Sequence, residues 1–407
     1  MSTPKINTKL QLDGFVCQHW NEINNFIDDQ MANLPVPIYS SVDIRESLDK
    51  YAPVDHNMYP AGFNNVCALD LEACSREFSR QIKKINPNAK VVGLIPESHT
   101  KNLFYLDHLA ILSKTIRDAG FEVIITSPDH QLFADGSNEL KLVSHSQFDL
   151  SIFPTTLSSN ILSANGKELD VVVLNNDQSS PLELPWREIK SPIVPTPLIG
   201  WFARQKIKHF TYYNKVASVF AEKFNIDPNL LEARFSFKDD VDFSTKEGID
   251  ELASEVDKLI AQIGKPNPVF VKASQGTYGM GIMVVKSGEE IKEMNRRDRN
   301  KMDVGKNKIK FTSVIIQEGI ETALKYDNMP AEVTIYLVGG KSLGGFMRAN
   351  QERGSNENLN AKGMVFRKYC ISEIKQNQDY QCKEAVYSIL ARLSTWAAAL
   401  EIEEAIK

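Results

Sequence analysis

The sequence predicts a protein that combines the α/β and α+β classes, with a layer of parallel strands followed by a module of antiparallel strands. Between residues 89 and 200, apolar segments of strand length alternate with a helical repeat, which is typical of parallel α/β layers. After residue 201, long helical segments flank pairs of β-branched segments that turn at glycines. A chain of 407 residues is too long for one ordinary core, so we expect three regions, at 1–88, 89–200 and 201–407.

The first region is expected to form helices around an irregular centre. This centre, residues 35–65, reads PVPIYSSVDIRESLDKYAPVDHNMYPAGFNN and is rich in Pro, Asn, Asp and Tyr. It shows no clear periodicity, and long segments of this kind are usually either disordered or functional.

The second region contains four apolar runs that we predict to be strands: KVVGLIP (90–96), FEVIITSP (121–128), FDLSIFP (148–154) and LDVVVLNND (169–177). Between the first two lies a helix with apolar residues at helical spacing, which Gly120 ends. Parallel sheets bind ligands at the carboxyl ends of their strands, where Asn175, Asn176 and Asp177 follow the last run. These three residues predict either a ligand site or a simple turn.

The third region opens with a helix over 201–224 and a second helix from about 245. It continues with a strand, SVIIQEGI (313–320), and with a hairpin over 331–350 that turns at Gly339 and Gly340. The last 27 residues are predicted to form an amphipathic helix.

One segment of this region, VFVKASQGTYGMGIMVV (269–285), places three glycines between two strand-like runs. Its spacing matches neither GxxxxGK[ST] nor GxGxxG, and its flanks predict a strand–loop–strand hairpin. Backbone approaches phosphate closely where side chains are absent, so the loop predicts a flap over a nucleotide, although glycines also serve bulges and turns. Lys272 lies within the first apolar run, where burial of a cation requires a compensating anion.

Polar residues downstream add candidates for nucleotide and metal binding. Gln317 and Glu318 end a predicted strand and could hydrogen-bond an adenosine. Glu332 and the run NENLN (356–360) offer the oxygen ligands that magnesium prefers, and Arg348 offers a cation. Isolated Glu and Asn residues are more often solvated surface.

Composition excludes several other classes of protein. With 47 basic and 52 acidic side chains, the chain has no global attraction for nucleic acid or anionic membranes, and we expect neither as a partner. The basic run 296–310 lacks aromatic residues and fits a solvated helix face better than a nucleic-acid site. No signal peptide and no run of 18 apolar residues are present, so we expect a cytoplasmic protein, and a homo-oligomer stays open.

The five cysteines and seven histidines predict no metal centre. Neither a CxxC pair nor an HExxH motif occurs, so we expect no zinc site. The odd number of cysteines fits reduced thiols better than a disulfide framework.

Taken in order, the strand lysine, glycine hairpin, Gln-Glu strand, acidic hairpin and Asn-rich loop resemble the ATP-grasp fold. The chain is more closely similar to the bacterial glutamate–cysteine ligases built on that fold. The blocks that carry this resemblance are residues 38–65, 171–180, 200–210, 269–285, 295–302, 315–320 and 344–364. The resemblance implies a pre-ATP-grasp-like α/β domain followed by an ATP-grasp module.

The resemblance also implies an activity, namely ligation of L-glutamate to L-cysteine with ATP and Mg²⁺, through a γ-glutamyl phosphate, as the first step of glutathione synthesis. Such catalysis depends on positioning and charge neutralisation, which agrees with the lack of a nucleophilic triad. Close alternatives are a glutathione synthetase or a dipeptide ligase, and a more distant one is a non-catalytic nucleotide sensor. The strand at 90–96 is not followed by the glycines of a nicotinamide oxidoreductase.

Residue roles follow from the same resemblance. ATP is expected to contact Lys272, Gly276, Thr277, Gly279, Gly281, Gln317 and Glu318. The expected catalytic residues are Arg348, Lys272 and Arg353. The amino-acid substrates are expected to contact Arg45, Asp43, Asp55, Asn57, Asn64, Asn65, Asn175 and Asn176. The expected metal ligands are Glu332, Glu357, Asn358 and Asn360.

One departure from the family pattern concerns the metal. Many ATP-grasp enzymes carry a late strand with the metal-binding form ExN, but this sequence ends in or just after its last predicted helix. We therefore expect metal ligands from residues 332–360, with the terminal Glu401, Glu403 and Glu404 as the alternative.

Overall fold

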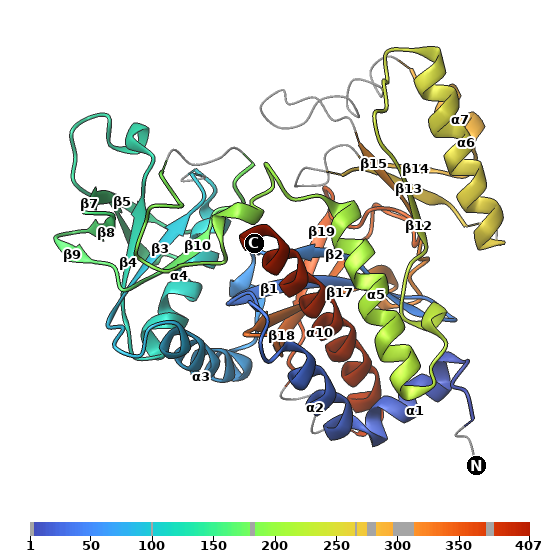
Figure 1. Ribbon diagram of the computed structural model, residues 1–407, viewed down its shortest axis with the longest axis horizontal. Helices are drawn as coiled ribbons and strands as arrows, with labels where there is room; N and C mark the ends of the chain where they lie inside the picture. Colours follow the sequence, from blue (N-terminus) through green and yellow to red (C-terminus); the bar gives the residue numbers. More distant parts are fainter. Residues whose placement is uncertain are drawn as a thin grey trace.

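The computed structural model describes residues 4–98, 101–179, 184–264, 267–274, 282–295, 313–371 and 378–407. These residues form a mixed α/β fold with three larger sheets and one small sheet (Figure 1). The glycine loop residues Gly276, Thr277, Gly279 and Gly281, and the basic run 296–310, lie outside the described residues.

The central sheet joins the two ends of the chain. Its strands run in the order β19 (Met364–Lys368), β18 (Lys341–Asn350), β17 (Met329–Val338), β1 (Tyr39–Glu46) and β2 (Tyr51–Asn57), all antiparallel. A short strand, β16 (Lys325–Tyr326), also pairs with β17. The hairpin predicted over 331–350 is confirmed, with its turn at Gly339 and Gly340.

The prediction of an irregular centre in the first region is wrong, because that centre contains β1 and β2. In β1, the polar residues Ser41, Asp43 and Arg45 alternate with Val42 and Ile44, which is the period of a strand. Every residue of β1 is buried, so its polar residues resemble those of a loop in the sequence while they lie inside the molecule.

The α/β sheet has the order β11 (Ile193–Val194), β10 (Val171–Asn175), β3 (Val91–Pro96), β4 (Glu122–Ser127), β6 (Asp149–Pro154) and β5 (Leu140–Val143). The four predicted strands are confirmed and pair in parallel, whereas β5 is antiparallel. Helices α3 (Ala68–Ile85) and α4 (Leu103–Asp118) contribute to the core that joins this sheet to β17 and β18. A small sheet of β7 (Thr156–Ser158), β8 (Ile161–Ala164) and β9 (Lys167–Glu168) extends from its edge.

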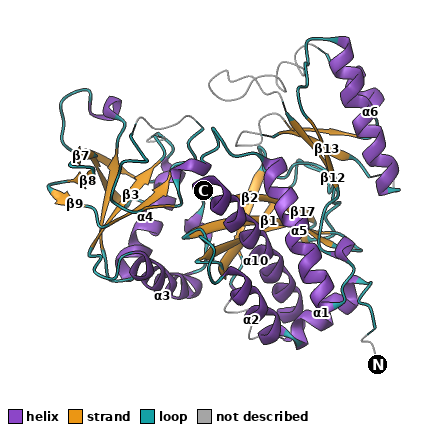
Figure 2. Ribbon diagram, in the orientation of Figure 1, coloured by secondary structure: helices purple, strands orange, loops and turns teal. Residues whose placement is uncertain are grey.

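The third sheet contains the strands that flank the glycine loop. Its order is β12 (Phe235–Lys238), β15 (Val314–Glu318), β13 (Val269–Ala273) and β14 (Ile282–Val285). β13 and β14 are antiparallel, with Lys272 opposite Ile282, so the predicted hairpin is confirmed in its strands. Helices α6 (Lys246–Ile263) and α7 (Gly288–Lys292) pack on this sheet (Figure 2).

Four helices cover the central sheet on the side away from the α/β sheet: α1 (Lys9–Gln18), α2 (Trp20–Met31), α5 (Lys206–Phe224) and α10 (Gln378–Ile406) (Figure 1). Short 3₁₀ turns, η1 to η4, span Phe63–Asn65, His130–Phe133, Pro197–Ile199 and Pro228–Leu230.

The last helix is present as predicted, but it is not amphipathic. Residues 384–399 of α10 are buried almost without interruption, because the sheet lies on one side and α1, α2 and α5 lie on the others. A helix that is enclosed in this way has no polar face.

The expectation of reduced thiols is also wrong in this structure, which contains two disulfides. Cys17 of α1 is bonded to Cys382 of α10, and Cys67 before α3 is bonded to Cys370 after β19. The fold brings these pairs to Cα–Cα distances of 4.9 and 5.4 Å, within the usual range for a disulfide. Because the partners are 365 and 303 residues apart, their spacing in the sequence gave no sign of pairing.

Candidate active site

A cavity of about 450 Å³ lies where the three larger sheets meet. Its floor is the central sheet, one wall comes from β13, β14 and β15, and the opposite wall comes from the ends of β3 and β10. The carboxyl ends of parallel strands in an α/β sheet are the usual place for a ligand.

The floor is polar because its strands alternate. Ser41, Asp43 and Arg45 of β1 line the cavity, and Glu332 and Thr334 of β17 lie beside them. The intervening residues are apolar and join the core beneath α5 and α10. One face of the same strands therefore stabilises the fold while the other forms the site.

Glu332 is held between two arginines at the floor. Arg45 Nε donates to Glu332 Oε2 at 2.8 Å, and Arg348 Nη1 donates to Glu332 Oε1 at 2.6 Å. Burial would raise the pKa of Glu332, but Arg45 and Arg348 lower it below its usual value. Glu332 is thus a carboxylate whose charge is already neutralised by the protein.

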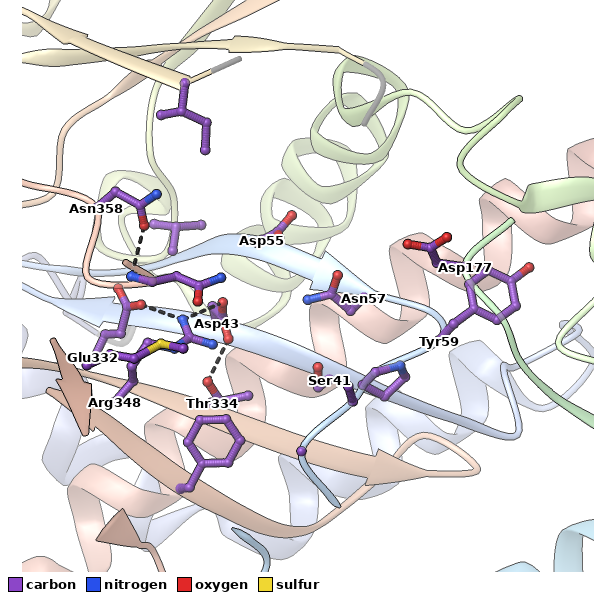
Figure 3. A pocket seen from close by; sticks show the side chains of 18 of the residues that line it. Ser41, Asp43, Asp55, Asn57, Tyr59, Asp177, Glu332, Thr334, Arg348 and Asn358 are labelled. Atoms are coloured by element: carbon purple, nitrogen blue, oxygen red, sulfur yellow. Dashed lines mark hydrogen bonds and ion pairs between the residues drawn. The ribbon is translucent and has the colours of Figure 1, made fainter. Parts of the chain in front are cut away.

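Two further carboxylates, Asp43 and Asp55, face each other across β1 and β2 (Figure 3). Asp43 accepts from Arg348 Nη1 at 3.1 Å and from Thr334 Oγ1 at 2.6 Å, and Asp55 pairs with Lys206 Nζ at 3.1 Å. Burial raises the pKa of Asp43, and the negative charges of Glu332 and Asp55 raise it further. For Asp55 the effect of burial is outweighed by Lys206 and Lys272, which hold its pKa well below the usual range.

Asn57 follows Asp55 by two residues and lies on the same face of β2. The pair has an acid–x–Asn spacing, similar to the ExN form that many ATP-grasp enzymes carry in a late strand. The structure shows this form instead in a strand from the first region, which joins the central sheet through β1.

Lys272 belongs to β13, the first strand of the glycine hairpin, and its ammonium is directed at polar oxygens. Its Nζ donates to Gln317 Oε1 at 2.8 Å and to the carbonyl oxygen of Val54 at 3.2 Å. Burial lowers the pKa of Lys272 to about 8, although Asp55 acts in the opposite direction. Gln317 Nε2 is buried and donates to no other described atom, so a hydrogen-bond donor remains at this end of the cavity.

Glu318 also lines this end, but its carboxylate is already engaged. Lys50 Nζ donates to Glu318 Oε2 at 2.6 Å, and the backbone N–H of Arg234 donates to the same oxygen at 3.0 Å. Phe270 and Ile320 provide apolar surface beside it.

The structure places most of the predicted site residues at this cavity. Those in its lining are Asp43, Arg45, Asp55, Asn57, Asn65, Asn175, Lys272, Gln317, Glu318, Glu332, Arg348, Asn358 and Asn360. Asn175 lies deepest in the α/β wall, and its amide is satisfied by Tyr39, Tyr105, His108 and the carbonyl of Pro60.

Among the predicted residues that the structure describes, four do not line the cavity: Asn64, Asn176, Arg353 and Glu357. Arg353 pairs with Glu357 at 3.5 Å, and both side chains are more than 40% exposed. Asn176 is buried behind the wall, where it donates to the carbonyl of Pro96. The terminal acids are also elsewhere: Glu401 forms a buried ion pair with Arg204, while Glu403 and Glu404 pair with lysines near the surface.

Other lining residues were not selected from the sequence. Trp201 precedes α5, and Lys206 is the first residue of that helix. Tyr59 and Glu97 line the far end beside Asp177, which the sequence marked as either a ligand or a turn residue. The two-residue spacing of Asp55 and Asn57 is a signal in the sequence that β2 is a strand with one polar face. No local signal marks Lys206 or Glu97 as a site residue.

The comparisons with known proteins bear on the whole chain. A sequence profile described as glutamate–cysteine ligase matches residues 13–402. The structure is similar to the crystal structure of a Methylobacillus flagellatus KT protein that carries gamma-glutamylcysteine synthetase as a provisional name, with a TM-score of 0.89 and 32% identity over 99% of each chain. No curated protein matches the sequence.

More distant similarities are found to other solved structures. D-alanyl-alanine synthetase A from Vibrio cholerae O1 biovar eltor has a TM-score of 0.40 and 13% identity, over 77% of this chain and 81% of that chain. A glutathione synthetase-like effector from Globodera pallida has a TM-score of 0.41 and 11% identity, over 89% and 81%. The family profile covers nearly the whole sequence, and the Methylobacillus flagellatus structure aligns over 99% of each chain. The chain therefore belongs to the glutamate–cysteine ligase family.

Proposed function

We propose that this member of the family joins the γ-carboxylate of L-glutamate to the amine of L-cysteine in an ATP-dependent reaction at the cavity described above. The observation that carries the proposal is the polar face of β17, β1 and β2, which presents paired carboxylates beside a buried lysine and two arginines. This combination suits phosphoryl transfer, whose catalysis consists mainly of positioning and charge neutralisation.

The end of the cavity near Lys272 fits the nucleotide. Lys272 would pair with the phosphates, and the unused amide hydrogens of Gln317 Nε2 would donate to the nucleotide. Phe270 and Ile320 offer apolar surface for a base. The expected cover by Gly276, Thr277, Gly279 and Gly281 remains part of this proposal.

Asp55, Asn57 and Asp43 fit a divalent metal better than the ligands expected from the sequence. Like charges that face each other across neighbouring strands are destabilising, and a cation between Asp43 and Asp55 would remove that cost. Their oxygens, with that of Asn57, are the hard donors that Mg²⁺ prefers. A metal bound there would neutralise phosphate charge during transfer. Asn358 lines the cavity nearby, whereas Glu357 lies outside it and Glu332 is neutralised by arginines.

The proposed chemistry has two steps. The γ-phosphoryl group of ATP passes to a γ-carboxylate oxygen of glutamate, which gives an acyl phosphate and ADP. The cysteine nitrogen then attacks the acyl carbon, so a C–N bond forms, the C–O bond to phosphate breaks, and the amine loses a proton. Arg348 is placed to stabilise the transferred group, and Arg45 orients the loop that carries Asn358 through the carbonyl of Glu357.

The test is an assay of the purified chain with ATP, Mg²⁺ and glutamate, with and without cysteine, while γ-glutamylcysteine is followed by mass. We expect cysteine-dependent ADP release with one equivalent of product. In Lys272→Ala, kcat/KM for ATP should fall by about 100-fold or more, because a charged phosphate contact is lost.

Lys286→Ala is the matched control, since Lys286 is an exposed lysine just after β14 and does not line the cavity. Its activity should equal that of the wild type. ADP release that requires another amino acid would show a different ligase, and equal activity of both variants would contradict the nucleotide site.

A further inference from the structure

Asp177 follows β10 and lies beside Tyr59 at the end of the cavity away from Glu332 and Arg348 (Figure 3). Its side chain is fixed by its neighbours, because Oδ1 accepts from the backbone N–H of Ser179 at 2.9 Å and from Ser179 Oγ at 2.8 Å. Its own backbone N–H donates to Glu97 Oε1 at 2.5 Å. The residue is only 6% exposed, so the carboxylate is largely withdrawn from water.

Asp177 differs in its charge balance from the four carboxylates that line the floor and the Lys272 end of the cavity, namely Asp43, Asp55, Glu318 and Glu332. Each of those has a cation from the protein: Arg348 for Asp43, Lys206 for Asp55, Lys50 for Glu318, and Arg45 and Arg348 for Glu332. Within the described part of the chain, Asp177 forms no ion pair with a lysine, arginine or histidine, and its Oδ2 accepts no hydrogen bond. A buried carboxylate without a cation is costly, so this end of the cavity favours a positively charged ligand group.

We propose that Asp177 binds the α-ammonium group of glutamate, an inference that rests on the proposed function. Both amino-acid substrates carry an ammonium, but they use it differently. The cysteine nitrogen must lose its proton before it can attack, and a neighbouring carboxylate would favour the protonated form. The glutamate ammonium takes no part in the reaction, so an ion pair between it and Asp177 can persist without slowing the chemical steps.

The geometry of β2 agrees with this orientation. Asp55, Asn57 and Tyr59 succeed one another at every second residue along the cavity (Figure 3). Two residues of an extended strand span about 7 Å, which is on the scale of an extended glutamate molecule. With the γ-carboxylate beside Asn57, two residues before Tyr59, the α-ammonium reaches toward Tyr59 and Asp177. Tyr59 donates its hydroxyl hydrogen to the carbonyl of Thr196 at 2.9 Å, so its oxygen can accept from the same ammonium.

The experiment compares glutamate with glutarate, which has the same chain and both carboxylates but no amino group. In the wild type we expect kcat/KM for glutarate to be about 10- to 100-fold lower than for glutamate, since a charged hydrogen bond is lost. In Asp177→Asn, which keeps the side-chain shape, kcat/KM for glutamate should fall by a similar factor while that for glutarate changes little. The ratio of the two substrates should therefore approach one, as expected for two groups that interact.

Asp149→Asn is the matched control, because it removes the same charge from an exposed position of the α/β sheet. It should retain the wild-type ratio, and circular dichroism should show that all variants are folded. An equal loss of both substrates in Asp177→Asn, or an effect confined to the KM of cysteine, would overturn the inference. The wild type alone also tests it, since equal use of glutarate and glutamate excludes an ammonium site.

The proposed function can fail separately from this inference. If the wild type forms γ-glutamylcysteine but shows no selectivity that depends on Asp177, only the assignment of Asp177 is wrong. If it forms no product, calorimetry of glutamate and glutarate with the wild type and Asp177→Asn gives the same comparison by binding, and an equal affinity of all four pairs overturns the inference.

Discussion

At the residue scale, the carboxylates of the cavity differ in how far the protein neutralises them, since Glu332 has two arginines while Asp43 shares Arg348 with it and Asp55 pairs with Lys206. Both carboxylate oxygens of Glu332 accept a hydrogen bond from a guanidinium group, one from Arg45 and one from Arg348, which leaves little advantage for a metal ion. Asp43 and Asp55 repel each other across neighbouring strands, and their pKa values are shifted in opposite directions. A cation between them would favour the ionised form of both.

This contrast leads to a test of the two sets of metal ligands. In Asp55→Asn the Mg²⁺ concentration for half-maximal activity should rise by about 10-fold or more, because Asp55, a proposed ligand to the ion, loses its charge. In Glu357→Gln, which removes the same charge from an exposed loop, it should stay within about 2-fold of the wild type. The measurement is a Mg²⁺ titration of activity, supported by Mn²⁺ binding followed by electron paramagnetic resonance. The opposite order would restore the ligands expected from the sequence.

Part of the candidate site could be predicted because its signals are local. Lys272 is visible as a cation within an apolar strand, and Gln317 and Arg348 stand in segments whose strand character is clear. The ion pair of Arg353 and Glu357 could not be foreseen, since it depends on the shape of one loop. For Asp177 the sequence left a ligand site and a simple turn open, because its lack of a cation appears only when its surroundings are known.

At the scale of elements, β1 and β2 decide the composition of the floor. They bring Asp43, Arg45 and Asp55 to strands β17 and β18, which are almost 300 residues later in the sequence. A register is a relation between two segments, so the sequence of either strand alone cannot reveal which residues will face each other. The hairpin β17–β18 was predictable because both of its strands and its turn are contiguous.

Helix α10 supports this floor from below through one buried charge. Glu401 accepts from Arg204 Nε at 3.0 Å and from Arg204 Nη2 at 3.1 Å, and it also pairs with His209. Arg204 Nη1 donates in turn to the carbonyl of His56 at 2.6 Å, next to Asp55. Burial would raise the pKa of Glu401, but Arg204 and His209 hold it well below its usual range.

Two glutamates of α10 therefore give a matched pair of variants. Glu401→Gln should lower the free energy of unfolding by about 3–5 kcal/mol, because it leaves Arg204 buried without its anion. Glu403→Gln removes the same charge from a surface pair with Lys407 and should change it by less than about 1 kcal/mol. Urea unfolding at pH 7 measures both, and similar losses would contradict the role of the buried pair.

At the scale of the whole molecule, burial of three histidines connects stability to pH. Burial lowers the pKa of His108 to about 4 and that of His209 below its ordinary value. Burial, with His209 and Arg204 nearby, also lowers the pKa of His56 well below its ordinary value. His56 and His209 are neighbours, with ring centroids 4.8 Å apart, whereas His108 contacts Asn175 at the end of the α/β sheet, so the effect arises at two places in the fold.

The sign of the effect follows from linkage. The folded pKa is lower than the unfolded value of about 6.5, so below that pH the unfolded chain binds protons that the folded chain does not. Stability is therefore retained above pH 6.5 and lost as the pH falls, by up to about 1.4 kcal/mol per pH unit for each histidine. Urea unfolding between pH 7 and 5 should show this slope. His108→Gln should reduce it by one histidine's share, and the exposed His130→Gln should not.

Because β1 pairs with β17, the central sheet can form only after both distant segments of the chain have been synthesised. Asp43 and Thr334 are hydrogen-bonded partners that are 291 residues apart. At the usual rate of translation, the later strand leaves the ribosome on the order of tens of seconds after the earlier one. An isolated two-stranded hairpin is marginally stable, so the β1–β2 hairpin must wait, with its charged face exposed, for β17. Strands β13, β14 and β15 are therefore synthesised before the floor of the cavity can form, and we expect activity only after β17 has left the ribosome.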